Sequence, residues 1–462
     1  MRIIFYGGAR SVTGANYLLE HNGIKMLVDC GLNQGSKYAE DLNYQPFKYD
    51  PAEISCVFIT HSHIDHIGRL PKLYKDGFRG KVYTTSATLD LMAVALPDNM
   101  KQITEEAKAM GHEPLFKQED LDGLISLVEG VNYGEMIELG DISVIFHDAG
   151  HILGSAIVEI RWKENSRKIY FSGDLGNPPT PLLPATERVN DADYIVVESA
   201  YGDRVHENRE ERREKLTSII IDTIKRGGVL MIPSFAVERT QELLYELNGL
   251  FSASGGNEKK IPQVPVFVDS PLAIKMTAVY RKHSDYFNKK TAYLIESGDD
   301  IFNFSGLQMT ATADDSKKIN DVPAPKIIIA GSGMSQGGRI LHHEIRYLSD
   351  PNSTILFVGY QVDGSLGRKI QRGDKEVRIM GQAVSVRCNI ENLSSYSAHA
   401  DQPGLLKWVG DSVLSEGGAG KLKKVFVVQG EEESSKTLAN LVHEKYGVDA
   451  VAPIEGDEFE LD

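Results

Sequence analysis

Four potential metal ligands lie within one short stretch of the chain, His61-Ser62-His63-Ile64-Asp65-His66. Imidazole nitrogens bind zinc and similar metals, and a carboxylate also accepts harder cations. His61 and His63 are two residues apart, so an extended backbone projects both side chains to the same side. A lone surface His-x-His would more often be inert, but three histidines and an aspartate grouped after an apolar strand are typical of ligand binding. This stretch therefore predicts a metal site.

The neighbouring sequence predicts that this stretch lies on a loop between a strand and a helix. Residues 57–60 (VFIT) are typical of a short buried strand, and residues 67–74 of the start of a helix. Other polar residues stand at or just beyond the ends of predicted strands: Asp29, His151, Asp174 and Glu198. Glycines beside His151 would let the backbone approach an ion. Asp29 taken alone is more typical of a loop cap than of a residue that supports a metal site.

The composition predicts a globular protein of two or three domains, because 462 residues exceed one ordinary domain. The hydrophobic content of 41% and the charged content of 25% are globular values. Cys30, Cys56 and Cys388 do not suggest a disulfide framework, which favours a reducing cytoplasm. The N-terminus has too short an apolar run for a signal peptide, and the sequence has no membrane-spanning window of ~18 apolar residues. We therefore expect a soluble cytoplasmic protein.

The charge of the chain is uneven. The net charge of −15 argues against nonspecific nucleic-acid binding by the whole surface. Residues 206–378 carry 24 Lys+Arg against 22 Asp+Glu, or +2, whereas the remainder carries 26 against 43, or −17. A polyanionic substrate would therefore have to be attracted by the middle segment and by bound metals.

From about residue 206 the sequence predicts strands that alternate with helices, as in a parallel α/β module. The predicted elements are helices at 207–225 and 238–249 and strands at 264–268, 326–330 and 354–359. Short β-type runs resume around 376–390. Two local expectations complete this assignment. Pro97 should break a helix at 87–110, and the acidic tail at 455–462 should be mobile.

Beyond these patterns, the chain resembles a known family. The stretches that contain Asp29, His61–His66, His151 and Asp174 are similar to the four metal motifs of the metallo-β-lactamase fold. Further stretches resemble the β-CASP subfamily, at 198–203, 234–242, 269–271, 331–334, 359–368 and 397–401. That subfamily includes bacterial and archaeal ribonucleases similar to the endonuclease subunit of the mRNA cleavage and polyadenylation machinery. The resemblance extends from about residue 3 to about residue 442.

The resemblance implies an α/β fold, namely an αββα metallo-β-lactamase sandwich with an inserted α/β β-CASP domain and a deep cleft between them. We expect the first part of the sandwich at 1–205, the β-CASP domain at 206–378 and the C-terminal part of the sandwich at 379–462. Carried onto matching positions, the family pattern implies two zinc ions. The first would bind His61, His63, His151 and Asp174. The second would bind Asp65, His66 and the bridging Asp174, with Asp29 orienting a ligand behind them.

The resemblance also implies how the reaction would proceed. A zinc-activated hydroxide would attack phosphorus while the metal neutralises the developing charge. His399 would protonate the leaving oxygen, Glu198 would polarise His399, and Asp65 also counts among the catalytic residues. Hydroxyl groups and guanidinium groups would contact substrate phosphate: Arg239, Ser332, Ser335, Arg368 and Ser397.

The predicted function is zinc-dependent hydrolysis of single-stranded RNA, by endonuclease action with 5′→3′ exonuclease action left open. A cleft with buried metals suits flexible single strands better than a stiff duplex. Three alternatives are a catalytically impaired RNA-binding scaffold, a DNA nuclease and a small-molecule hydrolase; the inserted domain argues against the last. The expected partner is single-stranded RNA and not a membrane, and a homodimer stays open.

One position departs from the family pattern. The last family motif has a histidine before Gly-Glu, which completes the second zinc site, but this chain has Gln429 before Gly430-Glu431. An amide oxygen is a poorer zinc ligand than imidazole. Three interpretations follow: a weak second zinc, a site with one metal, or a degraded relative that binds RNA without cleaving it. The other ligand positions are intact, which favours an active enzyme.

Overall fold

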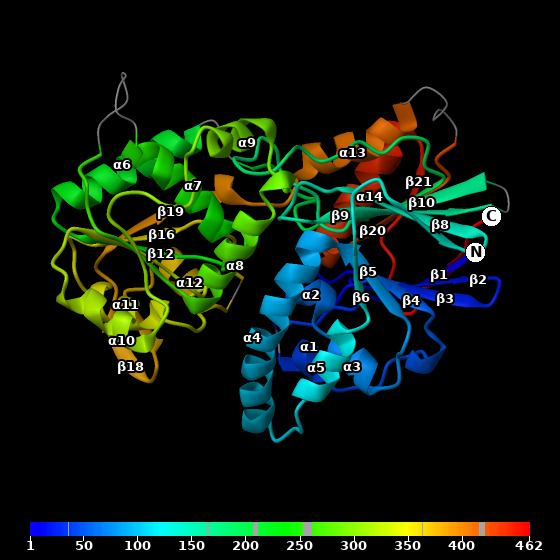
Figure 1. Cartoon of the computed structure of the whole chain (residues 1–462), viewed down its shortest axis with the longest axis horizontal. Coiled ribbons are helices and arrows are strands. Elements are labelled where there is room, and N and C mark those ends of the chain that lie inside the picture. The colour runs from blue at the N-terminus through cyan, green and yellow to red at the C-terminus, as the bar shows by residue number, and fades with distance from the viewer. Residues whose placement is uncertain (36, 164–165, 207–210, 253–260, 363, 415–420) are drawn as a thin grey trace. The chain divides into compact units, whose positions relative to one another are not determined.

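The computed structural model describes residues 1–462 except 36, 164–165, 207–210, 253–260, 363 and 415–420. The chain forms two compact units (Figure 1). Unit 1 comprises residues 1–180, 184–205 and 398–462, and unit 2 comprises residues 181–183 and 206–397. Among the helices described, none is long and apolar enough to cross a membrane.

Unit 1 contains two seven-stranded sheets. In spatial order, sheet 1 consists of β22 (Glu458–Glu460), β1 (Arg2–Gly7), β2 (Asn16–His21), β3 (Ile24–Val28), β4 (Cys56–Phe58), β5 (Lys81–Thr85) and β6 (Val128–Val131). Sheet 2 consists of β21 (Asp449–Val451), β20 (Lys424–Val428), β11 (Tyr194–Glu198), β10 (Arg167–Phe171), β9 (Ala156–Trp162), β8 (Ile142–Asp148) and β7 (Met136–Leu139).

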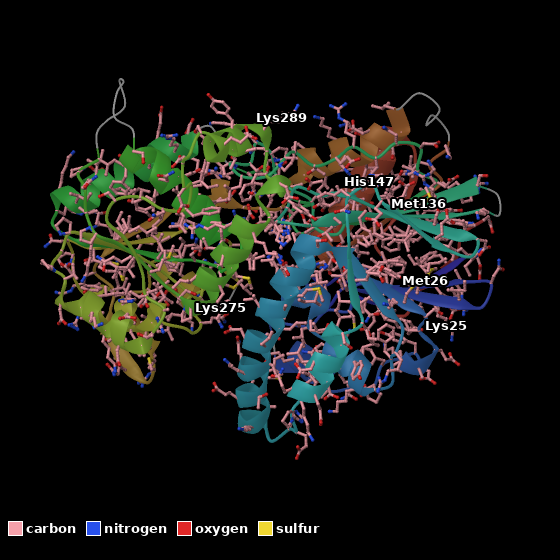
Figure 2. All side chains as sticks on the ribbon, viewed as in Figure 1. Lys25, Met26, Met136, His147, Lys275 and Lys289 are labelled. Atoms are coloured by element: carbon pink, nitrogen blue, oxygen red, sulfur yellow. The ribbon has the colours of Figure 1, made fainter. Side chains whose placement is uncertain are left out.

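The helices of unit 1 cover the outer faces of these sheets. They are α1 (Lys37–Leu42), α2 (Ile64–Ile67), α3 (Leu70–Lys75), α4 (Ser86–Met110) and α5 (Gln118–Ile125) beside sheet 1, and α13 (Gln402–Leu414) and α14 (Glu432–Tyr446) beside sheet 2 (Figure 1). Figure 2 labels two neighbours on β3: Met26, which is fully buried, and Lys25, which pairs with Glu53 at the surface.

Three apolar layers hold unit 1 together. Phe5 and Phe58 of sheet 1 pack against Phe171 of sheet 2 in the layer between the sheets. A second cluster joins sheet 1 to α3, α4 and α5, and a third joins sheet 2 to α13 and α14. This is the αββα sandwich that the family resemblance implies, and it fixes the strand ends on which the polar residues stand.

Unit 2 is built on one six-stranded parallel sheet. Its spatial order is β14 (Leu307–Met309), β13 (Val266–Asp269), β15 (Lys326–Ala330), β12 (Val229–Pro233), β16 (Thr354–Phe357) and β19 (Asn389–Asn392). A separate hairpin consists of β17 (Glu376–Ile379) and β18 (Gln382–Ser385). The helices are α6 (Arg212–Lys225), α7 (Arg239–Ser252), α8 (Pro271–Lys282), α9 (Lys289–Glu296), α10 (Ala313–Lys318), α11 (Ile340–Tyr347) and α12 (Leu366–Gln371). The predicted parallel α/β module is therefore present.

Several local expectations were wrong. Pro97 does not break α4. Met92 and Leu96 before it and Ile103 after it are buried, and this packing outweighs the backbone hydrogen bond that proline cannot form. The acidic tail is not a free end. It forms β22, which pairs with β1, and its Phe459 packs against the rings of Phe5 and Phe426.

The expected boundary between residues 378 and 379 falls inside unit 2. The hairpin β17–β18 packs on the core of this unit, and β19 extends its sheet by pairing with β16. Unit 2 therefore continues to residue 397. The expected helix at 207–225 begins at Arg212, and residues 207–210 lie outside the described part of the chain.

Candidate metal centre

The polar residues that unit 1 gathers stand at the carboxyl ends of strands from both sheets. Asp29 follows β3, the His61–His66 stretch follows β4, His151 follows β8, Asp174 follows β10, Glu198 ends β11 and Gln429 follows β20. Gly31 allows one close approach that this arrangement needs, since a Cβ there would lie 1.5 Å from the Asp65 carbonyl oxygen. Residues far apart in sequence thus meet because the sandwich aligns the ends of its strands.

Four of these side chains converge on one point. His63 Nδ1 lies 3.0 Å from His61 Nε2 and 3.3 Å from His151 Nε2. Asp174 Oδ2 lies 3.3 Å from His61 Nε2 and 3.5 Å from His151 Nε2. Ligand atoms of a tetrahedral zinc site with bonds of about 2.0–2.1 Å are about 3.3 Å apart. The spacing of these four atoms therefore fits one divalent metal ion.

The charge state of these four side chains also fits a metal ion. Burial lowers the pKa of His61, and lowers the pKa of His63 and His151 far below the ordinary histidine value. Burial alone would raise the pKa of Asp174, but the nearby His66 and His61 hold it well below its usual range. Neutral imidazoles and an ionised carboxylate are the forms that bind a metal.

Thr60 links the metal ligands to Asp29. Thr60 Oγ1 donates a hydrogen bond to Asp29 Oδ2 at 2.8 Å and lies 3.0 Å from His61 Nδ1. Asp29 Oδ1 accepts from the Thr60 backbone N–H at 2.8 Å, and Asp29 Oδ2 lies 2.7 Å from His66 Nδ1. Fixing Nδ1 of both histidines turns their Nε2 atoms inward. Sequence reasoning identified Asp29 but missed Thr60, whose only signal was its place directly before His61.

Asp65 and His66 are arranged less tightly than the four converging residues. His66 Nε2 lies 3.4 Å from Asp174 Oδ1 and 3.8 Å from Asp65 Oδ2. Burial would lower the pKa of His66, but the carboxylates of Asp174, Asp29 and Asp65 raise it well above the ordinary value. Within the described residues, neither of the two ligand groups that converge closely enough for a metal includes Asp65 or His66.

His399 and Glu198 form a pair beside Asp174. His399 Nδ1 lies 3.0 Å from Glu198 Oε2 and 3.8 Å from Asp174 Oδ2, and the His399 side chain is 28% exposed. Glu198 is fully buried, and its other oxygen accepts from the Leu175 backbone N–H. Burial opposes a charge on His399, yet Glu198 and Asp174 raise its pKa to about 9. The pair therefore presents a charged imidazolium that can donate a proton.

The five residues expected to bind phosphate lie in unit 2, and their surroundings differ. Arg239 is buried and pairs with Glu242, and Ser335 is buried and donates to Glu344. Ser397 is 8% exposed. By contrast, Ser332 is only partly buried and Arg368 is exposed.

His147 has a different role from the candidate ligands, although it stands four residues before His151, on β8 (Figure 2). Its Nε2 lies 2.7 Å from Glu159 and its Nδ1 lies 3.0 Å from Glu187. Burial opposes a charge on His147, but hydrogen bonds to Glu159 and Glu187 raise its pKa to about 9. Both ring nitrogens therefore bond to carboxylates rather than to the metal centre.

Comparison with known families matches three models along the chain. The metallo-β-lactamase superfamily domain matches residues 18–174, the β-CASP domain residues 240–370 and the Zn-dependent metallo-hydrolase RNA specificity domain residues 383–453. The first match contains all four converging ligands. These matches agree with the resemblance that the sequence motifs carry.

Comparison with individual proteins gives relatives over nearly the whole chain. Ribonuclease TTHA0252 of Thermus thermophilus is 38% identical over 442 residues, which is 96% of each chain. Transcription termination factor FttA of Methanosarcina mazei is 31% identical and covers 98% of this chain and 70% of its own length. A solved structure of a protein of unknown function from Enterococcus faecalis V583 matches with a TM-score of 0.56 at 12% identity, over 100% of this chain and 99% of its own. That last likeness concerns the fold alone.

Proposed function

The chain belongs to the β-CASP ribonuclease family of metallo-β-lactamase-fold hydrolases, and on this premise we propose that it hydrolyses phosphodiester bonds of single-stranded RNA with zinc as its metal. The observation that carries this proposal is the convergence of His61 Nε2, His63 Nδ1, His151 Nε2 and Asp174 Oδ2 beside the Glu198–His399 pair. The first set can hold a Lewis acid and the second can supply a proton, as hydrolysis of a phosphodiester requires.

Zinc is the metal that this donor set favours. Three imidazole nitrogens and one carboxylate oxygen suit zinc, whereas magnesium and calcium prefer sites made of oxygen ligands. When bound there, a zinc ion would lower the pKa of a water molecule and neutralise charge that develops on a phosphoryl group.

The residues of the chain would do the remaining work. Glu198 accepts a hydrogen bond from His399 Nδ1 and so orients the ring. The protonated His399 imidazole would donate a proton to the leaving oxygen. We further propose Ser332 and Arg368 as phosphate contacts. Ser332 Oγ already accepts from the backbone N–H groups of Gln336 at 3.0 Å and Gly337 at 3.2 Å, so what this hydroxyl can still offer is its own proton.

Two exposed aromatic side chains support a single-stranded substrate. Phe235 follows β12 and is 39% exposed, and Tyr360 follows β16 by three residues and is 47% exposed. Glycines lie under the Phe235 ring: a Cβ on Gly333 would be 2.6 Å from it and a Cβ on Gly359 would be 3.4 Å from it. Aromatic faces at the carboxyl edge of a parallel sheet can stack unpaired bases, which a duplex does not offer.

RNA rather than DNA is supported by the comparisons. The matched C-terminal model describes an RNA specificity domain, and the Thermus relative is named a ribonuclease. We propose a cytoplasmic site of action because Cys30, Cys56 and Cys388 are free and buried, which suits a reducing compartment.

The test uses the full chain and a set of matched oligonucleotides. Internally labelled single-stranded RNA, the same RNA as a duplex, single-stranded DNA of the same sequence and a circular RNA are incubated with zinc or with a chelator. His61→Ala removes a ligand, and His112→Ala serves as the matched control because His112 stands at the surface after α4. We expect metal-dependent cleavage of single-stranded and circular RNA by the native chain and by His112→Ala.

Each other result assigns a different function. Retention of RNA without any change in its length would favour the scaffold. Equal cleavage of DNA would favour a general nuclease, and failure to cut circular RNA would replace endonuclease action with exonuclease action. Cleavage that survives both the chelator and His61→Ala would refute the metal site.

A further inference from the structure

Gln429 stands beside His66, on the side where a second metal would bind. Its backbone follows β20 with φ +49°, and its N–H donates to the Gly8 carbonyl at 2.7 Å. The residue is 4% exposed, and its amide nitrogen lies 2.9 Å from His66 Nε2. The Gln429 side chain therefore lies inside the candidate metal centre, at the position where the family motif has a histidine.

The other ring nitrogen of His66, Nδ1, is hydrogen-bonded to Asp29. His66 Nδ1 lies 2.7 Å from Asp29 Oδ2, so Nδ1 carries a proton and donates it to that carboxylate. If His66 is neutral, its Nε2 lone pair accepts from the Gln429 amide N–H; if it is charged, Nε2–H donates to the amide oxygen. In either state, the atom that a second metal would need has the Gln429 amide as its partner.

The surroundings leave space for this amide, whose oxygen has no hydrogen-bond partner among the described residues. Gly8 has φ +63°, and a Cβ there would lie 2.4 Å from Gln429 Oε1 and 2.6 Å from the Tyr17 hydroxyl oxygen. A cavity of about 10 Å³ beside Gln429 is lined by Tyr17, Asp29 and His66, among others. That volume is about one water molecule. The glycine-rich turn near the N-terminus thus makes room for the Gln429 side chain.

We propose that this chain binds one metal ion, at His61, His63, His151 and Asp174, and that Gln429 closes the second position by bonding to His66. The first set fits a metal because four of the six distances between its ligand atoms are 3.0–3.5 Å and all of them lie within 4.8 Å. The second set lacks an imidazole at position 429, and an amide is a poorer zinc ligand than imidazole whichever of its two ends faces the site. The proposal rests on the metal dependence of the proposed function, but the number of bound ions is measured without any substrate.

The experiment counts zinc ions per chain. The native protein, Gln429→His and Gln429→Asn are dialysed against one buffered concentration of free zinc, and bound zinc is measured by elemental analysis and by native mass spectrometry. Asparagine tolerates positive φ and keeps an amide, but its shorter side chain withdraws from His66. We expect one zinc ion in the native chain and in Gln429→Asn, and two in Gln429→His. The second site of Gln429→His should bind zinc at least about tenfold more tightly than the same position of the native chain does.

His66→Gln provides a second measurement in case Gln429→His does not fold, with circular dichroism as the check. With one metal ion, His66→Gln keeps the zinc content of the native chain, whereas a native two-metal site would lose one ion. Two zinc ions of similar affinity in the native chain would overturn the proposal, as would a loss of zinc in His66→Gln. A native chain that binds one zinc but cleaves no RNA would refute the proposed function and leave this inference standing, and a chain that binds no zinc would refute both.

Discussion

Replacement of His399 by alanine removes the proposed proton donor and keeps the side chains of all four converging ligands, although the His399 ring lies 4.6 Å from the His151 ring. His399 contributes its ring from a segment that pairs with Gly176 through a single β-bridge, so the backbone has an anchor that does not depend on the ring. Glu198→Gln is the companion change. It keeps the shape of a fully buried side chain and its contact with the Leu175 N–H, but it removes the charge that faces His399 Nδ1 at 3.0 Å.

The two changes should have different magnitudes. A positioned proton donor contributes about 10²–10⁴-fold to rate, so His399→Ala should slow RNA cleavage by that factor, equivalent to roughly 3–5 kcal/mol of barrier. Glu198→Gln turns an amide NH2 group toward His399 Nδ1 and so removes one hydrogen bond to a charged group, worth about 1.5–3 kcal/mol; it should slow cleavage about 10- to 150-fold. Both residues act on one proton, so the double variant should be about as slow as His399→Ala alone.

The assay measures single-turnover cleavage with enzyme in excess over substrate. It compares RNA, whose leaving group is a basic alkoxide, with a p-nitrophenyl ester of a nucleotide, whose phenolate leaves without a proton. His399→Ala should be severely slow on RNA and close to native on the ester. Zinc content and thermal unfolding of each variant show that the metal centre and the fold are retained.

Two results would refute this reasoning. An equal loss on both substrates would mean that His399 positions the substrate or supports the metal centre. Native rates on RNA would mean that another group, or solvent, supplies the proton.

Three further predictions concern other parts of the molecule. Phe235→Ala should weaken binding of single-stranded RNA, measured by fluorescence anisotropy in chelator, by about 5- to 150-fold, whereas Phe235→Tyr should retain it; equal loss with abasic RNA would argue against stacking. Burial raises the pKa of Glu344 from 4.5 to about 8, so the folded chain keeps a proton that the unfolded chain releases. The free energy of unfolding of the native chain relative to Glu344→Gln should therefore fall between pH 4.5 and 8, by at most roughly 1.4 kcal/mol per pH unit, and a constant difference in urea denaturation would contradict this. Phe459→Ala should cost about 1–3 kcal/mol of unfolding free energy, because its ring packs against Phe5 and Phe426, whereas a mobile tail would show no change.

The candidate metal ligands were accessible to sequence reasoning because they lie in short motifs, which also carry the family resemblance that implies the ligand set. A histidine or aspartate shortly after a strand is visible in a few residues, and His61, His151 and Asp174 each stand three residues beyond a strand end. The alternation of strands and helices likewise revealed the parallel module of unit 2, because periodicity depends on near neighbours. The family membership and the hydrolase class followed from several such short motifs taken together.

Other predictions failed where long-range packing outweighed a local signal. Acidic residues and the end of the chain suggested a mobile tail, but Phe459 completes a layer between two sheets and holds β22 against β1. Pro97 suggested a helix break, but the buried face of α4 continues past it. The phosphate role expected of Arg239 stays a prediction, although the buried guanidinium of this residue pairs with Glu242.

The sequence by itself determined which atoms could bind a metal, because donor chemistry belongs to the side chain and strand-end positions can be recognised locally. Only the tertiary structure decided which of those atoms converge, since His61 and Asp174 meet through the alignment of two sheets. It also decided what the departure at Gln429 means. The amide reaches His66 across 363 residues of sequence, and no local pattern could predict that contact. Spatial proximity of distant strand ends is a property of the packed sandwich, and the chemistry of the second metal position depends on it.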